Sequence, residues 1–253
     1  MKAIIYAAGR AMRLGPAYAE QPKVLIEFAG ESLLARHCRR LAAAGVTELC
    51  VVTGHRRELL ADALHRHAPV HGLRAVELFN PDYTEGSVLS MAVSLPVIEA
   101  ERAPFLLMDA DVLYGPALLP RLRASPHRSA LLVDRNFSQA DEDPVLVPLR
   151  GGRPFDLVKK WQGEGEALGE SVGFFKVDPA DAARLAEETR ARVAAGRRRD
   201  SLDDVLRVLV QEGRLGAEDI TGEQWTEVDF PEDVAYAAEH VLPWVQAAEA
   251  AAR

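Results

Sequence analysis

The stretch that decides the fold is the N-terminal MKAIIYAAGRAMRLG, residues 1–15. Residues 2–6 form a short apolar, β-prone run, and the small residues that follow end it at Gly9. This pattern predicts a buried first strand that opens into a loop at its carboxyl end.

Beyond this strand, β-prone runs and helical periodicities alternate. Helices are predicted at residues 31–44, 57–67 and 87–95, and strands at 48–53, 73–79 and 104–108. Strands that alternate with helices at such spacings indicate an α/β fold, with a Rossmann-like, mainly parallel sheet covered by helices on both faces. Ligands of such sheets bind outside the carboxyl ends of the strands. We therefore expect the loop after Tyr6 and the acidic turn after Met108 to face one crevice.

The pattern changes in the second half of the chain. Short strands without helices between them are predicted at residues 130–133, 144–149, 154–161 and 171–177, followed by helices at 179–195 and 202–211, a strand near 224–228 and a helix from Pro231. The short strands favour a small antiparallel extension. We expect one domain over residues 1–253, made of the halves 1–128 and 129–253, and we expect the closing AAEAAAR to fray.

Composition excludes several classes of protein. The formal net charge is -8, which disfavours binding to nucleic acid or to an anionic membrane. No apolar run approaches the roughly 20 residues of a membrane span, and the N-terminus lacks a signal-peptide core. Cys38 and Cys50 have no metal-ligand spacing and are predicted to be buried free thiols. We expect a cytoplasmic protein, with its oligomeric state open, a homodimer included.

The first loop offers groups that bind phosphate. Small residues let a ligand approach the backbone, backbone N–H groups can bind phosphate oxygens, and Arg10 and Arg13 add charge-assisted contacts. Pro22-Lys23 follows shortly after. Neither G-x-x-x-x-G-K-[ST] nor G-x-G-x-x-G is present, which argues against a P-loop kinase and a classical NAD enzyme. A plain tight turn is the competing interpretation.

Acidic residues follow two predicted strands. Asp109-Ala110-Asp111 places two carboxylates on one side of the sheet, and carboxylate oxygens are natural Mg²⁺ ligands. A solvated turn is the alternative. Asp229 stands at the end of a later strand, where it could equally cap the last helix, whereas Asp233 fits a first-turn acid of that helix.

Together, AAGRAMRL with Pro22-Lys23, the strand-end DAD and the terminal EVDFPEDV resemble the sugar-phosphate nucleotidyltransferase superfamily. The order and approximate spacing of the three motifs match over nearly the whole chain. The family loop usually reads A-A-G-x-G-x-R-(L/M), so Ala11 stands where glycine is usual. We expect Ala11 to need a negative φ and to reshape the loop slightly. A second departure is Gly15-Pro16-Ala17-Tyr18, where sugar nucleotide members often read P-L-T.

The resemblance implies a GT-A-like nucleotidyltransferase of the EC 2.7.7 type, with residues 1–128 binding the nucleotide and 129–253 the acceptor. It implies that Arg13 holds the leaving phosphates and that Lys23 bridges the α-phosphate and the attacking phosphate. Asp111 and Asp229 would bind Mg²⁺, with Asp109 as a further or indirect ligand. Base and ribose would lie against nucleotide-binding residues in two segments, namely Ala7, Ala8, Gly9, Arg10, Ala11 and Met12, and Gly86 and Ser87.

Within the superfamily the chain looks most like the phosphocholine and inositol-phosphate cytidylyltransferases. This rests on motifs including Asn80-Pro81-Asp82-Tyr83, Lys159-Lys160, residues 169–175 and Asp200-Ser201-Leu202. The expected reaction joins CTP to a small phospho-alcohol or phosphonate and gives a CDP- or CMP-conjugate and pyrophosphate. The alternatives are a sugar-1-phosphate uridylyl- or thymidylyltransferase, an inositol-phosphate cytidylyltransferase, and a silent nucleotide-sensing domain.

Acceptor contacts are predicted for Lys160, Glu170 and Asp200. Trp161, Phe174, Tyr83 and Trp225 are the aromatic faces on which a quaternary ammonium could lie. Core packing is the favoured interpretation for at least one of Phe174 and Phe175, which could simply alternate between core and surface. The run Arg197-Arg198-Arg199 favours a more anionic or polyhydroxylated acceptor if it faces the pocket, and otherwise is a solvated helix end.

Overall fold

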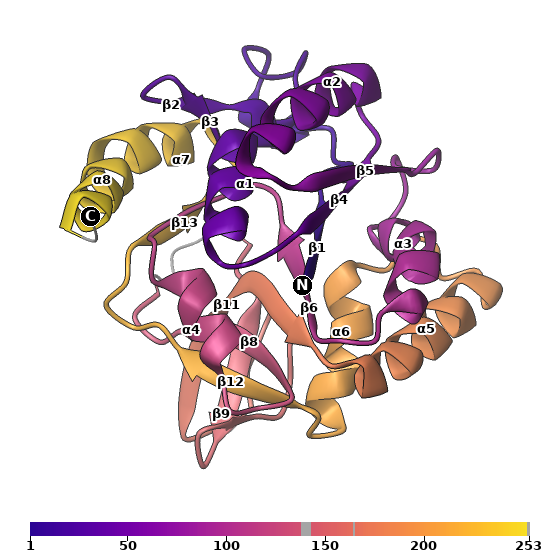
Figure 1. The fold of residues 1–253 in the computed structure, drawn as a ribbon. Coiled ribbons are helices and arrows are strands. Elements are labelled where there is room, and N and C mark those ends of the chain that lie inside the picture. Colours follow the sequence, from indigo (N-terminus) through magenta and orange to yellow (C-terminus); the bar gives the residue numbers. More distant parts are fainter. Residues whose placement is uncertain (138–142, 164, 252–253) are drawn as a thin grey trace. The chain divides into compact units, whose positions relative to one another are not determined.

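A computed structural model describes residues 1–137, 143–163 and 165–251. Its contacts gather the chain into two compact units, each described by itself (Figure 1). The first unit comprises residues 1–84, 108–120 and the chain from Glu223 onwards, and the second comprises residues 85–107 and 121–222. The predicted division into halves 1–128 and 129–253 stays a prediction.

A parallel β-α-β-α-β arrangement opens the first unit. Its strands are β1 (Lys2–Tyr6), β4 (Glu48–Thr53) and β5 (Arg74–Phe79), and its helices are α1 (Leu33–Ala43) and α2 (Arg57–His67). β4 pairs in parallel with both β1 and β5. Ala3, Ile4 and Ile5 of β1 are fully buried, as a strand covered on both faces requires.

Shorter elements complete the first unit. β7 pairs antiparallel with β13, and β2 with β3. They are β7 (Val112–Tyr114), β13 (Trp225–Glu227), β2 (Glu27–Phe28), β3 (Glu31–Ser32), the 3-10 turns η1 (Met12–Leu14), η2 (Lys23–Leu25) and η3 (Pro69–His71), α7 (Pro231–Tyr236), the π-helical turn η4 (Ala237–Val241) and α8 (Leu242–Ala251).

Antiparallel strands dominate the sheet of the second unit. β11 pairs antiparallel with β8 and β9, β10 pairs antiparallel with β9, and β12 pairs in parallel with β8. The strands are β8 (Ser129–Asp134), β9 (Leu146–Arg150), β10 (Arg153–Pro154), β11 (Ala167–Val177) and β12 (Leu215–Asp219). The predicted antiparallel extension is therefore confirmed.

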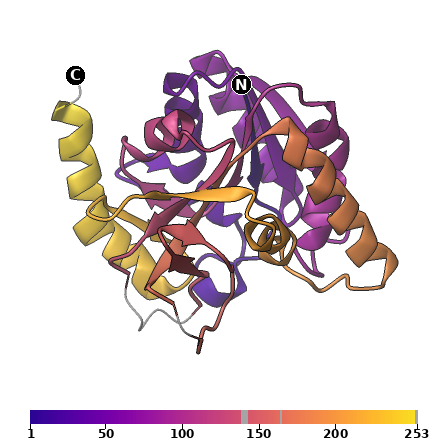
Figure 2. The same cartoon turned by 90° about the horizontal axis from the view of Figure 1, so that it is seen from below.

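Three helices of the second unit pack against one another (Figure 1 and Figure 2). They are α3 (Val88–Ala100), α5 (Pro179–Ala194) and α6 (Leu202–Gln211). β6 (Phe105–Asp109) and α4 (Leu118–Ala124) each begin in one unit and end in the other. The predicted α/β class is confirmed.

Some predicted elements are wrong. The strand expected at residues 154–161 is reduced to β10 and a single bridge at Val158, and β7, β12 and α4 were not predicted. In the terminal AAEAAAR, residues 247–251 are not frayed as expected, because α8 continues to Ala251 and Glu249 pairs with Arg39 and Arg40. The last two residues of this stretch lie outside the described residues. Cys38 and Cys50 are buried free thiols, as predicted. Within the described residues, every helix is too short or too polar to cross a bilayer.

Candidate active site

The loop after β1 lies at the edge of the first unit's parallel sheet. The N–H of Ala7 donates to Val52 O (3.0 Å), and Ala8 O accepts from the N–H of His55 (3.1 Å). A Cβ on Gly54 would stand 2.7 Å from Ala8 O, so glycine is required there for the two loops to meet. Arg10 and Met12 are exposed, whereas Ala8 and Ala11 are buried.

The expectation for Ala11 is wrong. Its backbone is left-handed, with φ 52° and ψ 31°. The loop therefore keeps the conformation that glycine adopts freely instead of being reshaped. Alanine accepts it at a cost of roughly 1–2 kcal/mol, because its Cβ crowds the following carbonyl oxygen.

Two basic and two acidic side chains meet at this loop. Lys23 Nζ lies 3.0 Å from Asp111 Oδ2 and also contacts Asp229 Oδ1. Arg13 Nη2 lies 2.6 Å from Asp229 Oδ2, and its guanidinium stands over the Phe230 ring, 5.1 Å from the centroid. Arg13, Lys23, Asp111 and Asp229 are called the Lys23 cluster below.

The pairing of β7 with β13 explains how distant segments reach the Lys23 cluster. Tyr114 pairs with Trp225, and Val112 pairs with Glu227. Beyond the paired strands, the N–H of Val228 donates to Asp111 O at 2.9 Å. Asp111 and Asp229 are therefore brought together by backbone pairing.

Asp233, and not Asp229, caps the helix that follows. The Asp233 carboxylate accepts the N–H groups of Asp229 (2.9 Å) and Phe230 (2.8 Å) from within the first turn of α7. Asp233 is thus a first-turn acid, as predicted, and the Asp229 carboxylate points to Lys23 and Arg13.

Electrostatics keep Lys23 charged. Burial alone would lower its pKa, but attraction to Asp111 and then to Asp229 outweighs burial and raises the pKa above its ordinary value. The side chain of Lys23 is only 15% exposed, so this ion pair is shielded from solvent. A permanently cationic lysine is suited to binding a phosphate and unsuited to acting as a general base.

The two carboxylates fit a hard divalent cation. Oxygens that share one ammonium nitrogen lie no more than roughly 6 Å apart, twice a hydrogen-bond length of about 3 Å. Among residues 1–137, 143–163 and 165–251, no three His, Cys, Asp or Glu side chains are grouped for metal binding. Mg²⁺ is commonly bound by one or two carboxylates together with waters and substrate phosphates, so the pair Asp111 and Asp229 is a donor set of the right kind for it. Asp109, the last residue of β6, stands two residues before Asp111.

Gly86 and Ser87 have structural partners in the second unit. The N–H of Gly86 donates to Arg198 O (2.8 Å), and Ser87 Oγ accepts from the N–H of Leu202 (2.7 Å). A Cβ on Gly86 would meet Asp200 O at 2.3 Å, so close backbone contact alone accounts for this glycine. Their predicted contact with the nucleotide stays a prediction.

The predicted acceptor residues occupy three different surroundings. Lys160 is exposed, and Glu170 is 7% exposed on β11, opposite Asp134 of β8. Asp200 accepts from Arg192 Nη1 (2.5 Å) and lies 2.8 Å from Arg197 Nε. Asp200 is therefore already neutralised by two guanidinium groups.

Core packing, the favoured interpretation for at least one of Phe174 and Phe175, is confirmed for both, since both are fully buried and do not alternate between core and surface. Gly173 has φ 74°, and the register of β11 against β8 shifts between Ser171 and Phe175, so consecutive side chains both enter the core. The expectation that Phe174 offers an acceptor face is therefore wrong.

The other aromatic and basic candidates also have partners. Trp161 meets Phe155 edge-on, with ring centroids 5.4 Å apart. Arg198 is engaged by Glu85, with its Nη2 2.7 Å from Glu85 Oε1. Arg197 pairs with Asp200. Within the described part of the second unit, residues 197–199 therefore do not offer three unpaired guanidinium groups to an anionic acceptor.

Sequence reasoning missed His37, a buried histidine on α1. His37 Nε2 lies 2.9 Å from Ala110 O, within the DAD turn, and Nδ1 lies 3.4 Å from Tyr114 Oη. Burial lowers the pKa of His37 to about 4, so the ring is neutral. A histidine on the apolar face of a helix was the available signal, but most such residues merely pack.

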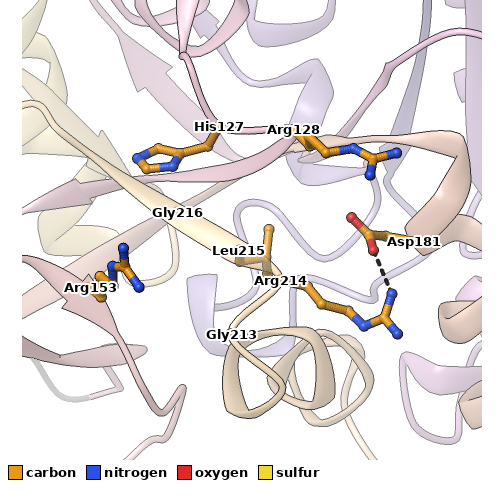
Figure 3. A pocket seen from close by; sticks show the side chains of 8 residues that line it. All are labelled: His127, Arg128, Arg153, Asp181, Gly213, Arg214, Leu215 and Gly216. Carbon is orange, nitrogen blue, oxygen red and sulfur yellow. Dashed lines mark hydrogen bonds and ion pairs between the residues drawn. The ribbon is translucent and has the colours of Figure 1, made fainter.

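A pocket of about 390 Å³ lies in the second unit, near the first residues of β8 and β12 (Figure 3). Its walls are His127, Arg128, Arg153, Asp181, Gly213, Arg214, Leu215 and Gly216. Arg214 pairs with Asp181 (2.9 Å) and Glu212 (2.8 Å), and Arg128 pairs with Asp178 (3.0 Å). These acids offset the basic lining, and the pocket contains none of the predicted site residues.

Comparison with known proteins shows the family to which this chain belongs. The family model described as "MobA-like NTP transferase domain" matches residues 3–193. The bifunctional IPC transferase and DIPP synthase of Rubrobacter xylanophilus is 32% identical over 245 residues, 96% of this chain and 52% of that protein. The CMP-5'-(3-aminopropyl)phosphonate synthase of Streptomyces rubellomurinus is 31% identical over 155 residues, 58% of this chain and 24% of that protein. This chain thus spans about half of the first relative and about a quarter of the second.

A solved structure shares the fold. The inositol-1-phosphate CTP transferase of T. maritima superposes with a TM-score of 0.72 at 24% identity, covering 92% of this chain and 90% of that one. At this identity the likeness shows the fold alone, and the fold is the α/β arrangement predicted from the sequence.

Proposed function

Because this chain belongs to the MobA-like NTP transferase family, and is by family a nucleotidyltransferase, we propose that it is a Mg²⁺-dependent cytidylyltransferase. Its substrates would be CTP and a small phospho-alcohol or phosphonate. Its products would be a cytidine nucleotide conjugate and pyrophosphate.

The observation that carries the proposal is the Lys23 cluster, in which opposite charges from four chain segments gather beside the loop after β1. In this proposal the cations bind phosphates and the carboxylates bind a metal ion. The two relatives support the choice of nucleotide and acceptor, since one is named for a CMP-phosphonate product and the other for an IPC transferase activity.

The reaction is an in-line displacement. An oxygen of the acceptor's phosphate or phosphonate attacks the α-phosphorus of CTP and forms a new P–O bond. The bond between the α-phosphorus and the oxygen bridging to the β-phosphorus breaks, and pyrophosphate leaves with its electron pair. No covalent intermediate with the protein forms, so catalysis rests on positioning and electrostatic stabilisation.

Each member of the Lys23 cluster has a role in this reaction. Arg13 binds the β- and γ-phosphates, and Phe230 restrains its guanidinium. Lys23 lies between the α-phosphate and the attacking phosphate and reduces their repulsion. Asp111 and Asp229 hold Mg²⁺, with Asp109 as a further or indirect ligand. The bound ion supplies positive charge that neutralises the phosphates.

Pyrophosphate release tests the proposal. The protein is incubated with Mg²⁺, each nucleoside triphosphate in turn, and phosphocholine, an aminoalkyl phosphonate, inositol 1-phosphate or glucose 1-phosphate. Rapid release is expected only with CTP and one of the first three acceptors, and Asp111→Asn is the inactive control. Turnover of glucose 1-phosphate with UTP or dTTP alone would replace the cytidylyltransferase assignment, and no release with any pair would favour a nucleotide-sensing domain.

A further inference from the structure

His37 holds the chain segment that carries Asp111 of the Lys23 cluster at two places. It lies on α1 and is fully buried. Its Nε2 stands 2.9 Å from Ala110 O, the carbonyl oxygen of the residue between Asp109 and Asp111. Fixing this peptide carbonyl fixes the backbone from which the Asp111 side chain leaves.

The second ring nitrogen reaches the far end of the same segment. A carbonyl oxygen can only accept, so Nε2 carries the proton and Nδ1 accepts from the Tyr114 hydroxyl, 3.4 Å away. Tyr114 is the last residue of β7 and pairs with Trp225 of β13, the strand that leads to Asp229. One imidazole thus holds both ends of residues 110–114, and this segment is paired with the strand before Asp229.

Tyr114 has a second contact from α1. The Arg40 guanidinium stands 5.0 Å from the centroid of the Tyr114 ring, and Arg40 Nη2 donates to Glu249 Oε1 of α8 at 2.6 Å. Tyr114 is 2% exposed and Arg40 is 7% exposed, so both side chains are shielded from water. The contacts with His37 and Arg40 together limit the movement of the Tyr114 hydroxyl.

We propose that His37 is a positioning residue, which places Asp111 relative to Asp229 by holding Ala110 O and the Tyr114 hydroxyl, at the two ends of the Asp111 segment. His37 touches neither nucleotide nor acceptor in this role. The inference rests on the proposed function in one respect, namely that the two carboxylates bind a divalent cation. Partners that orient metal ligands typically change metal affinity by about 10–100-fold when they are removed.

The test is the affinity of the full-length protein for Mn²⁺, measured by the loss of the free-ion EPR signal, together with the melting temperature. His37→Leu keeps the bulk and removes both hydrogen bonds, so Mn²⁺ should bind at least about tenfold more weakly. His37→Gln can place an amide N–H near the position of Nε2 and should stay within about threefold of wild type. Tyr114→Phe, which keeps the ring stacked on Arg40, should fall between them and serves if His37→Leu does not fold.

Leu41→Ala is the matched control, because Leu41 is fully buried on the same helix. It should lower the melting temperature without changing Mn²⁺ affinity. Equal Mn²⁺ affinity in His37→Leu and wild type would overturn the inference, as would an equal loss in Leu41→Ala. If Asp111→Asn loses Mn²⁺ while His37→Leu keeps it, only the inference fails. If the wild type itself binds no Mn²⁺, the proposed metal site fails, and the inference fails with it.

Discussion

The two units use their charged residues differently. In the first unit, Lys23 pairs with the carboxylates of Asp111 and Asp229, which come from separate parts of the chain. Neither carboxylate closes a turn or caps a helix. In the second unit, Asp200 joins the last turns of α5 to the turn that follows, and the N–H of Gly86 is bonded to Arg198 O. Charged side chains that gather without closing a turn or capping a helix indicate a catalytic or binding site. Charged side chains that fasten turns indicate a role in stability.

The largest effect should come from Lys23→Ala, which we expect to fold and to lose about 10²–10³ in turnover, since one charged contact in such a site contributes roughly 3–4 kcal/mol. Steady-state pyrophosphate release measures it. Lys2→Ala is a close control, because Lys2 is also 15% exposed and pairs with Glu48 at 2.9 Å. A Lys23→Ala enzyme within about threefold of wild type would remove Lys23 from the mechanism.

The next largest effect separates Asp229 from its neighbour Asp233. Asp229→Asn should raise the Mg²⁺ concentration for half-maximal rate by at least about tenfold, because a direct ligand matters at least as much as the groups that orient one. Asp233→Asn keeps a side-chain oxygen that can accept the N–H groups of Asp229 and Phe230, so it should change the Mg²⁺ requirement by no more than about threefold and lower stability by about 1 kcal/mol through a weakened helix cap. Mg²⁺ titrations and thermal melts of both variants give the answer, and exchanged phenotypes would contradict these roles.

The sequence predicted some elements closely because their signals are local. β1, β4, α2 and α6 have the bounds expected from apolar periodicity and flanking residues. The short strand β7 lacks such a signal, because three residues carry too little periodicity, whereas its partner β13 was expected near residues 224–228. Yet their pairing brings Asp229 to Asp111. The candidate site residues could thus be named from motifs, while their convergence depends on a long-range pairing.

Two further residues show what lies beyond local reasoning. His37 acts through Ala110 O, a backbone atom that a sequence motif does not encode. Ala11 adopts a conformation that single-residue preference disfavours, because the surrounding loop over-determines it. In both places tertiary contacts prevail over local preference.

Glu170→Gln asks whether the second unit also contributes to chemistry. A carboxylate attracts an ammonium by charge but binds a polyol by hydrogen bonds, which an amide can replace. We expect the kcat/KM of an amine-bearing acceptor to fall by about tenfold and that of inositol 1-phosphate by no more than about threefold. Acceptor kinetics at saturating CTP measure both. Equal, negligible losses would make buried Glu170 a purely structural residue.

Asp200→Asn should act on stability more than on binding. Arg192 would keep Glu188 as a partner at 2.8 Å, so the loss should be about 1 kcal/mol. Thermal melts and the acceptor KM are measured together, with Glu99→Gln as the control, since Glu99 forms an ion pair with Arg190 on the same helix as Arg192. An unchanged melting temperature with a KM raised tenfold would make Asp200 an acceptor contact and would remove the contrast between the units.

The smallest effect is expected at the loop after β1. Ala11→Gly relieves the left-handed strain of roughly 1–2 kcal/mol but gives the unfolded chain more freedom, at about 0.5–1 kcal/mol. The balance is a gain of about 0.5 kcal/mol, or about 1–2 °C in melting temperature for a chain of this size. Ala8→Gly is the matched control, because Ala8 is buried in the same loop without a positive φ. It should lose stability by about 0.5–1 kcal/mol, since it adds the same freedom to the unfolded chain and relieves no strain. If Ala11→Gly raises the free energy of unfolding and Ala8→Gly lowers it, the strain lies at Ala11. If both substitutions lower it equally, the loop holds alanine at position 11 without strain.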